Sequence, residues 1–323
     1  ALGKHGQMDW MLDMVDERLD PARLLEGART LLLVADQYAR QGDADLDDQR
    51  THRGRIAKYA RGRDYHEVMR KRLGMLADRL RAMHPGSRFR MFVDTGPVLE
   101  REHAARAGLG FIGKNTMLIN PTVGSYLVLG GLITTLELSE SAELSDPSSH
   151  CGGCTRCIDA CPTGAITPFS VDARKCISYL TIEHEGPIDT SLHEAMGNWV
   201  FGCDICQDVC PFNAPHDGRG PSPVNSVYRP KDALREGSID LLELIGWTTL
   251  ERQTRFGVSA GKRASLSMLR RNAVIAAGNH LSQHESPELI EPLRELLADS
   301  DPTVSQTALE TTARISGCSG GGT

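Results

Sequence analysis

The spacing of apolar and polar residues changes along the chain and predicts where helices and strands lie. Apolar residues recur every three or four positions at 65–83, among many basic ones, which predicts a long helix. Shorter helices are predicted at 8–15 and at 99–107, the second ending at Gly108 as a glycine C-cap favours. Short apolar runs predict strands at 31–35, 89–93, 117–120 and 125–135, the last two as a pair around a turn.

The C-terminal part has a different pattern, with leucine and alanine at helical spacing. It predicts three short amphipathic helices, at 266–281, 287–298 and 302–315. The segments 272–279 and 301–308 look like HEAT-type helical repeats. Such repeats serve as docking surfaces, although two units would serve equally well as a packing cap.

These patterns predict an α+β or α/β fold in three segments. Residues 1–145 alternate helices and strands, residues 146–225 hold most of the cysteines, and residues 226–323 are helical. An acidic, serine-rich stretch at 139–149 is typical of a linker, and the stretch 221–230, bounded by prolines, indicates a second break.

The chain is acidic overall, with a formal net charge of −6, but its basic residues are concentrated in two places. Residues 50–90 contain thirteen Lys or Arg against three Asp or Glu, and residues 251–271 contain six against one. Such patches suit docking on a phosphate backbone, although a solvated helical face has the same composition. No apolar run is long enough to span a bilayer and no secretory signal is visible, so we expect a cytoplasmic protein, and a monomer.

Eight of the nine cysteines fall in one arrangement. The two runs are Cys151-x2-Cys154-x2-Cys157-x3-Cys161-Pro and Cys203-x2-Cys206-x3-Cys210-Pro, with Cys176 between them. The first spacing is that of bacterial ferredoxins, in which the fourth cysteine binds the other of two [4Fe–4S] clusters. The sequence therefore predicts two clusters.

The ferredoxin crossover divides these cysteines into two sets of four. Val200 stands where the second run should have its first cysteine, so Cys176 is predicted to replace it. Cys318, in a glycine- and serine-rich tail, is left over as a surface thiol. The predicted ligands are Cys151, Cys154, Cys157 and Cys210 for cluster 1, and Cys161, Cys176, Cys203 and Cys206 for cluster 2.

Disulfides and zinc are the alternative uses for such cysteines. Disulfides need an oxidising compartment, which nothing in the sequence indicates. Zinc explains either CxxC pair but not the third cysteine, the x3 spacing or the proline after each run. Two clusters explain the whole pattern, and they indicate that the protein transfers electrons.

Asp94 is the strongest candidate for acid–base chemistry outside the cysteines. It follows an apolar run and precedes Thr95-Gly96-Pro97, so its carboxylate is expected at a strand end where a substrate can approach. An Asx-turn or N-cap aspartate would have the same neighbours. Tyr65 and His66 are expected at the surface of the basic helix, and Lys114 is expected to touch a cofactor phosphate or cap a turn.

Several long stretches resemble the epoxyqueuosine reductase family. They are FVDTGPVLER at 92–101, AGLGFIGKN at 107–115, GSYLVLG at 124–130, CPTGAI at 161–166, RKCISYLTIE at 174–183 and GCDICQ at 202–207. The resemblance covers nearly the whole chain. Family members usually carry a longer segment before the point matching Ala1, so we expect a truncated N-terminus.

The resemblance implies a cobalamin-dependent enzyme that reduces epoxyqueuosine to queuosine at the wobble position of tRNA, the last step of queuosine biosynthesis. Electrons from a low-potential donor, such as a flavodoxin or ferredoxin, would reach cob(I)alamin through the two clusters. The anticodon stem-loop would be the substrate, and Asp94 matches the family's proton donor. The three segments would be a cobalamin-binding catalytic domain, a ferredoxin-like domain and a HEAT-like domain.

The resemblance also implies further contacts to the corrinoid. Leu118 and Leu129 would act through backbone atoms, or would only pack in the core. Ser178, Asp204 and Ile205 lie beside cluster cysteines, where a cluster must approach the corrin ring. The full set is Arg18, Asp94, Leu118, Leu129, Ser178, Asp204 and Ile205.

Two other functions remain open from the sequence. A reductive dehalogenase-like enzyme would combine the same cofactors, but such enzymes typically carry an export signal and a longer chain. A non-catalytic, ferredoxin-like electron carrier would need little beyond residues 150–215. Binding of cobalamin excludes the carrier, and a requirement for RNA excludes the dehalogenase.

Overall fold

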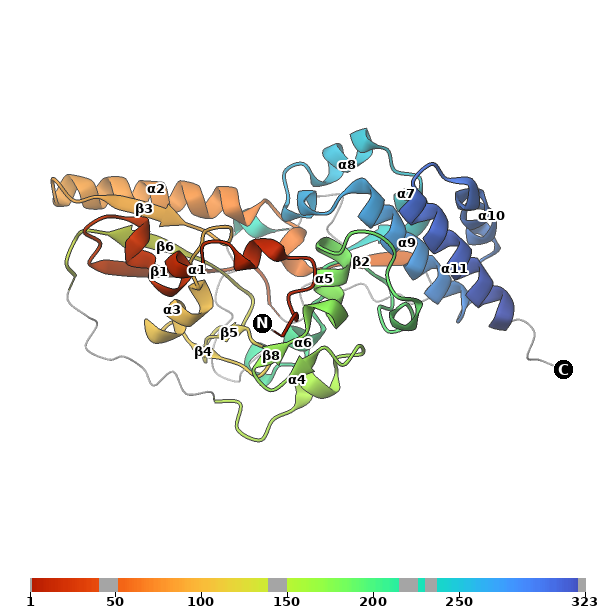
Figure 1. The fold of residues 1–323 in the computed structure, drawn as a ribbon, viewed down its shortest axis with the longest axis horizontal. Helices are drawn as coiled ribbons and strands as arrows, with labels where there is room; N and C mark the ends of the chain where they lie inside the picture. The colour runs from red at the N-terminus through yellow and green to blue at the C-terminus, as the bar shows by residue number, and fades with distance from the viewer. Residues whose placement is uncertain (1, 41–51, 139–149, 215–225, 230–236, 319–323) are drawn as a thin grey trace.

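The structure, a computed structural model, describes residues 2–40, 52–138, 150–214, 226–229 and 237–318 (Figure 1). A sheet with helices on both of its faces forms one end of the molecule, and a group of helices forms the other. The cluster-binding segment lies between them along one side. The predicted linker at 139–149, most of the break at 221–230 and the side chain of Cys318 lie outside the described residues.

The first sheet has three antiparallel strands in the order β1-β6-β3. Side chains alternate along its central strand, so that Val128 and Leu132 pack on helix α2. Leu129 and Ile133 face the other side, toward helix α3 and the 3-10 helix η2. The bounds are β1 (Thr30–Gln37), β6 (Leu127–Thr134), β3 (Phe89–Phe92), α2 (Tyr65–Met83), α3 (Glu100–Arg106) and η2 (Pro21–Leu24).

Helix α2 has the predicted bounds because its start and its apolar face are both encoded locally. Asp64 is its N-cap and accepts a hydrogen bond from the backbone N–H of His66 at 2.9 Å. Its buried side chains recur at helical spacing, and its basic side chains face solvent. The buried residues are Val68, Met69, Leu73 and Ala77.

Two predicted elements differ from the structure. Strand β5 (Leu118–Ile119) pairs with β4 (Phe111–Ile112) and not with β6, so the predicted strand pair around the turn is wrong. The helix predicted at 8–15 is a 3-10 helix, η1 (Asp9–Leu12), followed by α1 (Val15–Leu19). Met14 separates them because its φ of 52° lies in the left-handed region, which a continuous helix does not contain.

The second sheet joins all three predicted segments. Its strands are β10 (Ser238–Asp240), β2 (Arg53–Ile56) and β9 (Trp199–Phe201), in that order. β2 pairs antiparallel with β10 and parallel with β9. One short strand therefore comes from each of 1–145, 146–225 and 226–323, and the three segments share a sheet.

The cluster-binding segment is made of short elements. They are α4 (Arg156–Asp159), β7 (Ile166–Thr167), β8 (Ser170–Val171), η4 (Ala173–Lys175), α5 (Ile177–Ile182), η5 (Thr190–Leu192), α6 (Ile205–Asp208) and η6 (Pro211–Asn213). The segment also binds the N-terminal residues through two hydrogen bonds. The Lys4 ammonium donates to Ser170 Oγ at 2.8 Å. The backbone N–H of Gln7 donates to the Tyr179 hydroxyl at 2.7 Å.

The C-terminal helices pack around α9, which is buried on most of its surface and contacts both α7 and α11. Its bounds, Leu266–Leu281, are those predicted, and Ser265 caps its start. Among the described helices, none has the length and apolar character needed to cross a membrane. The others are α7 (Leu241–Ile245), α8 (Thr249–Phe256), η9 (Ala260–Arg263), α10 (Pro287–Glu295), η10 (Leu296–Ala298) and α11 (Pro302–Cys318), with η3 (Lys58–Ala60) and η7 (Ser226–Tyr228) earlier in the chain.

Candidate active site and metal centres

Asp94 lies two residues beyond the end of β3, and its side chain is 58% exposed. Its backbone has a φ of 49°, a left-handed conformation that aspartate tolerates better than most residues. The Tyr65 hydroxyl donates to Asp94 Oδ2 at 2.8 Å, and His66 Nε2 lies 3.0 Å from the same oxygen. The first two residues of α2 therefore hold the predicted proton donor at an open position.

The role of Tyr65 and His66 was missed from the sequence, which placed them only on a helix surface. His66 Nδ1 lies 2.8 Å from Asp64 Oδ1, and Lys262 Nζ lies 2.6 Å from Asp64 Oδ2. Asp64 is fully buried. The site is thus a chain of charged side chains that runs from Lys262 through Asp64 and His66 to Asp94.

The charges in this chain are mutually dependent. Burial alone would lower the pKa of His66, but its hydrogen bonds to Asp64 and Asp94 raise that pKa to about 9. Burial would raise the pKa of Asp94, yet the hydrogen bonds from His66 and Tyr65 lower it. Burial and the charge of Asp94 raise the pKa of Tyr65, which therefore remains a donor. At neutral pH the site holds a carboxylate beside an imidazolium.

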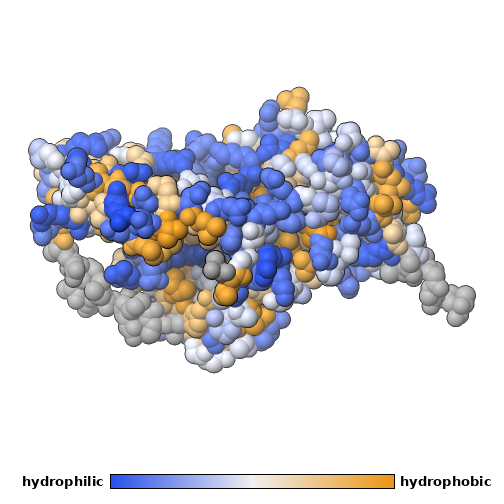
Figure 2. All heavy atoms as spheres, viewed as in Figure 1, coloured by the Kyte–Doolittle hydropathy of each residue, from blue (hydrophilic) through white to orange (hydrophobic). Residues whose placement is uncertain are grey.

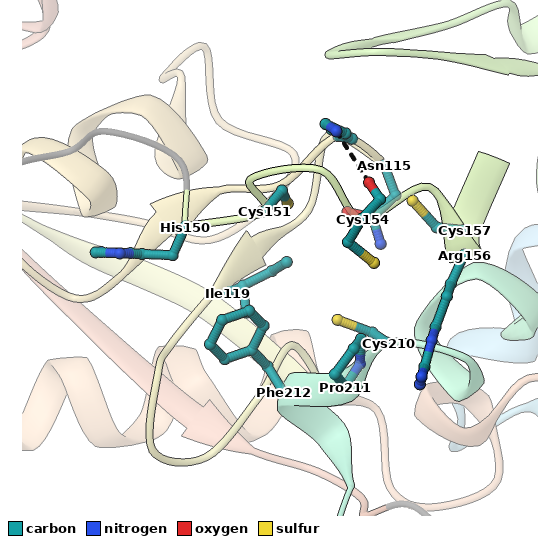
Figure 3. Close-up of a pocket in the computed structure, with 11 residues that line it drawn as sticks. Asn115, Ile119, His150, Cys151, Cys154, Arg156, Cys157, Cys210, Pro211 and Phe212 are labelled. Carbon is teal, nitrogen blue, oxygen red and sulfur yellow. Dashed lines mark hydrogen bonds between the residues drawn. The ribbon is translucent and has the colours of Figure 1, made fainter.

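The four cysteines predicted to bind cluster 1 line one cavity of about 260 Å³ (Figure 3). Lys114 lines it too, and its ammonium donates to the carbonyls of Gly152 at 2.7 Å and Cys154 at 2.9 Å. Lys114 therefore caps the cysteine loop, one of its two predicted roles. Cys151, Cys154, Cys157 and Cys210 share the cavity with Asn115, Ile119, His150, Arg156, Pro211 and Phe212.

The four cysteines predicted to bind cluster 2 also lie near one another. Burial raises the pKa of Cys206, and the charges of Cys176, Asp204, Cys157 and Cys161 raise it further, in that order. Burial and the charges of Cys206 and Cys176 also raise the pKa of Cys203. Burial also raises the pKa of Cys176. Backbone N–H groups at the start of α5 lower it, because hydrogen-bond donors stabilise a thiolate.

Neither predicted set forms a single-ion site in the described part of the chain. Among the described residues no three His, Cys, Asp or Glu side chains converge closely enough to bind one metal ion. A [4Fe–4S] cluster is bound by four thiolates, the number that each predicted set contains. The two ligand sets remain predictions.

Asp204 is buried near Cys203 and Cys206, two of the predicted cluster 2 ligands, and is held by Lys58. Its Oδ2 accepts from the Lys58 backbone N–H at 2.7 Å, whereas its Oδ1 is buried without a hydrogen-bond partner in the described part of the chain. Burial raises the pKa of Asp204 to about 6. An orphaned acceptor here fits a ligand that carries amide donors, as the corrin side chains of cobalamin do.

The remaining predicted corrinoid contacts fall in three places. Leu118 is buried and Leu129 half-buried, and both pack against α3, as core residues do. Ser178 is at the start of α5, and Ile205 begins α6. Arg18 is on α1, where its guanidinium donates to the carbonyls of Asp13 and Trp10.

Arg18 adjoins exposed apolar surface. Large apolar side chains of η1 and α1 are between 44% and 71% exposed, and Figure 2 shows apolar side chains gathered near the centre of the face where these elements lie. Exposed apolar surface of this kind usually marks a binding site. The residues are Trp10, Met11, Leu12, Met14, Val15 and Leu19.

Comparison with known proteins accounts for both parts of the site. Residues 150–213 match a family model described as a 4Fe-4S double cluster binding domain. Residues 18–95, which contain Tyr65, His66 and Asp94, match a model described as Epoxyqueuosine reductase QueG, DUF1730.

Curated relatives and solved structures agree with these matches. An epoxyqueuosine reductase of Pseudomonas aeruginosa is 40% identical over 282 residues, covering 86% of this chain and 75% of that protein. One of Gloeobacter violaceus is 42% identical over 281 residues, covering 86% and 84%. A crystal structure of selenomethionine-labelled epoxyqueuosine reductase superposes with a TM-score of 0.82 at 32% identity, covering 93% of this chain and 77% of that one.

A second structure shows an epoxyqueuosine reductase with an epoxyqueuosine-modified stem loop of tyrosine tRNA. It superposes with a TM-score of 0.81 at 32% identity, and the match covers 93% of this chain and 77% of that one. Identity of this extent, over most of both chains, reflects common descent. The chain belongs to the epoxyqueuosine reductase family and is an oxidoreductase.

Proposed function

We propose that this protein reduces epoxyqueuosine in tRNA to queuosine, with Asp94 as the proton donor to the epoxide oxygen. The observation that carries the proposal is the carboxylate of Asp94, held in the open by Tyr65 and His66 within a segment that matches the family model. A Bacillus subtilis epoxyqueuosine reductase was described with an aspartate-bearing catalytic loop swung out of its active site. The exposed position and left-handed backbone of Asp94 suit a loop of that kind.

Proton donation is the step that this chain's own side chains can supply. When an epoxide C–O bond breaks, the oxygen becomes an alkoxide, which is too basic to form readily without a proton. A carboxyl group at hydrogen-bond distance lowers that barrier. The side chain of Asp94 is exposed, so a substrate can reach it. Tyr65 donates a hydrogen bond to Asp94 Oδ2, and this bond fixes the direction in which Asp94 Oδ1 points.

Cobalamin and two [4Fe–4S] clusters are the cofactors that we propose. Bound cobalamin supplies a strongly reducing metal centre, and the clusters supply the electrons that recharge it. Arg18, the exposed apolar surface of η1 and α1, and the orphaned oxygen of Asp204 are the groups that would hold the corrinoid. Ser178 and Ile205 would face it from the cluster 2 side.

Basic side chains near the site suit an RNA substrate. Lys262 and Arg263 are each about half exposed and belong to η9, next to the carboxylates of Asp64 and Glu183. Arg70 and Lys71 are exposed on α2, a little more than one turn beyond His66. These cations of α2 and η9 would bind the phosphates that flank a flipped or exposed wobble base.

The proposal is tested with an anticodon stem-loop that carries epoxyqueuosine. The protein is reconstituted anaerobically with iron, sulfide and cobalamin, reduced with dithionite, and incubated with the stem-loop. The RNA is then digested and its nucleosides are separated by mass. We expect queuosine to form only when cobalamin and reductant are both present.

Two results would contradict the proposal. Formation of queuosine without cobalamin would remove the corrinoid from the reaction. Failure to form queuosine by protein with eight irons and one bound cobalamin would mean that the reducible substrate is a different one, and a halogenated small molecule would then be the next substrate to assay.

A further inference from the structure

Both ring nitrogens of His66 face carboxylate oxygens. Nδ1 lies 2.8 Å from Asp64 Oδ1, and Nε2 lies 3.0 Å from Asp94 Oδ2. An ionised carboxylate can only accept hydrogen bonds, so both nitrogens must carry a proton. With both carboxylates ionised, this geometry makes His66 an imidazolium in the free protein.

Asp94 has the opposite character. Its Oδ2 receives hydrogen bonds from both the Tyr65 hydroxyl and His66, which an ionised oxygen accommodates better than a protonated one. The depressed pKa of Asp94 agrees with this. The predicted proton donor thus begins the reaction without a proton, and the nearest available proton lies on His66.

The surroundings of His66 keep it charged and fixed. Asp64 is fully buried and pairs with Lys262, which also lies 3.7 Å from Glu67. The ring of Tyr65 stacks on His66 with centroids 4.1 Å apart. Three other groups interact with this site. The ring of Tyr59 contacts that of Tyr65, and Glu100 of α3 interacts electrostatically with Asp94. The charge of Arg263 in η9 lowers the pKa of Asp94.

We propose that His66 is the proton store of this site, passing its Nε2 proton to Asp94, which passes a proton to the departing epoxide oxygen. This inference rests on the proposed function. His66 acts through Asp94 and is therefore a positioning and proton-supplying residue. Asp64 keeps the proton on His66 between turnovers, and Lys262 keeps Asp64 in place.

Each turnover needs two protons, and the store supplies the first of them. Conversion of an epoxide to an alkene consumes two electrons and two protons and releases water as both C–O bonds break. The two electrons come from an external low-potential reductant through the clusters. The first proton comes from His66 through Asp94. The second enters from solvent at the exposed Asp94, and solvent then restores His66.

The test is the pH dependence of a single turnover with pre-reduced protein, so that electron delivery does not limit the rate. In the wild type we expect a plateau from pH 6 to 8 and a fall above pH 9, as His66 loses its proton. H66Q can still donate a hydrogen bond to Asp94 but cannot supply a proton. Its rate should fall by about 10²- to 10⁴-fold, and the fall above pH 9 should disappear.

D64N provides an independent measurement. It leaves Asp94 and His66 in place but removes one of the two carboxylates that keep His66 charged. The fall in rate should move from about pH 9 toward the ordinary histidine value of 6.5. A purely structural role for Asp64 would lower the rate at every pH without moving the profile.

Chemical rescue and a matched control complete the experiment. H66A should regain activity with added imidazole, most strongly below the pKa of free imidazole, where the additive is protonated. His84, at the exposed C-terminal end of the same helix, is the control, and H84Q should keep the wild-type rate and profile.

The outcomes separate this inference from the proposed function. A wild-type protein that forms no queuosine contradicts the function itself. A wild type that forms queuosine, together with H66Q that keeps the wild-type rate and the fall above pH 9, overturns the proton store and leaves the function intact. An H66Q protein that loses its clusters is set aside, and the D64N profile then decides.

Discussion

The guanidinium of Arg271 donates a hydrogen bond to the backbone carbonyl of Leu180 at 2.6 Å. Leu180 lies in α5, the short helix that begins directly after Cys176, and Arg271 lies in the first half of α9. The same guanidinium also donates to the carbonyls of His184 at 2.7 Å and Gly186 at 2.6 Å. One fully buried cation thus joins the helical end of the molecule to the segment that holds a predicted cluster 2 ligand.

Replacing Arg271 with methionine should destabilise the protein strongly. Burial lowers the pKa of Arg271 to about 10, so the side chain is still charged at neutral pH. The methionine would fill part of the space but would leave three carbonyls without their donor. We expect the free energy of unfolding to fall by at least about 3 kcal/mol, measured by chemical denaturation.

R294M is the matched control for R271M. Arg294 is 65% exposed and lies 3.6 Å from Glu291, so its loss should cost less than about 1 kcal/mol. If the two substitutions lowered the free energy of unfolding equally, the burial of Arg271 would not explain its contribution to stability.

Asp94→Asn should abolish turnover and leave cofactor binding intact. Asparagine has the same shape as aspartate and also tolerates a left-handed backbone, so the loop should keep its conformation. It cannot carry the proton, and a loss of about 10²-fold or more is expected. The measurements are queuosine formation, iron content and the cobalamin absorbance of the purified variant.

Asp78→Asn provides the comparison, since Asp78 is an exposed carboxylate on α2 whose ion-pair partner among the described residues is Arg81. It should retain full activity. Turnover by D94N at a tenth of the wild-type rate or more would exclude Asp94 as the proton donor.

The parts of the fold that local sequence encodes were predicted well. Helices α2 and α9 have the predicted bounds because each begins at a capping side chain, Asp64 or Ser265, and continues with apolar residues at helical spacing. Strand β6 was also found, but its partners were not. It pairs with β1 and β3, and no local pattern in the sequence specifies which strands become neighbours in the sheet.

What the sequence missed depends on contacts between distant residues. The sheet β10-β2-β9 consists of strands of three or four residues, each too short to show a period. His66 was placed correctly on α2, but its role comes from Asp94, which follows in the chain 28 residues later. The double-cluster segment could be recognised because iron–sulfur spacing is itself a local pattern, whereas the division of its cysteines between the clusters stays a prediction.

Cys176→Ala should remove one cluster and leave the other. Cys176 is the predicted fourth ligand of cluster 2, whereas the cavity of cluster 1 is lined by a different set of four cysteines. Reconstituted protein should therefore contain about four irons in place of about eight, measured by iron analysis and by the EPR spectrum of the reduced form.

Cys318→Ala is the control for this measurement, because Cys318 belongs to neither ferredoxin run. It should bind the full amount of iron. A C176A protein that keeps eight irons would show that another residue completes cluster 2, and the pairing inferred from the missing cysteine at Val200 would be wrong.

The charged pair of His66 and Asp94 should also appear in the stability of the protein. The pKa of His66 is raised in the folded state to about 9, from 6.5. A raised pKa stabilises the folded state fully below pH 6.5, and this contribution is lost as the pH rises through 9. It amounts to at most about 3.5 kcal/mol, since one pKa unit corresponds to about 1.4 kcal/mol.

Comparison with H66Q isolates this contribution from the titration of cysteines and lysines over the same range. The difference in unfolding free energy between wild type and H66Q should be largest near pH 6 and should shrink steadily between pH 7 and 9.5. Denaturation of both proteins, without clusters and at fixed ionic strength, gives the measurement. A difference that stays constant with pH would mean that His66 is not held as an imidazolium, because only a group that loses its proton in this range can produce the slope.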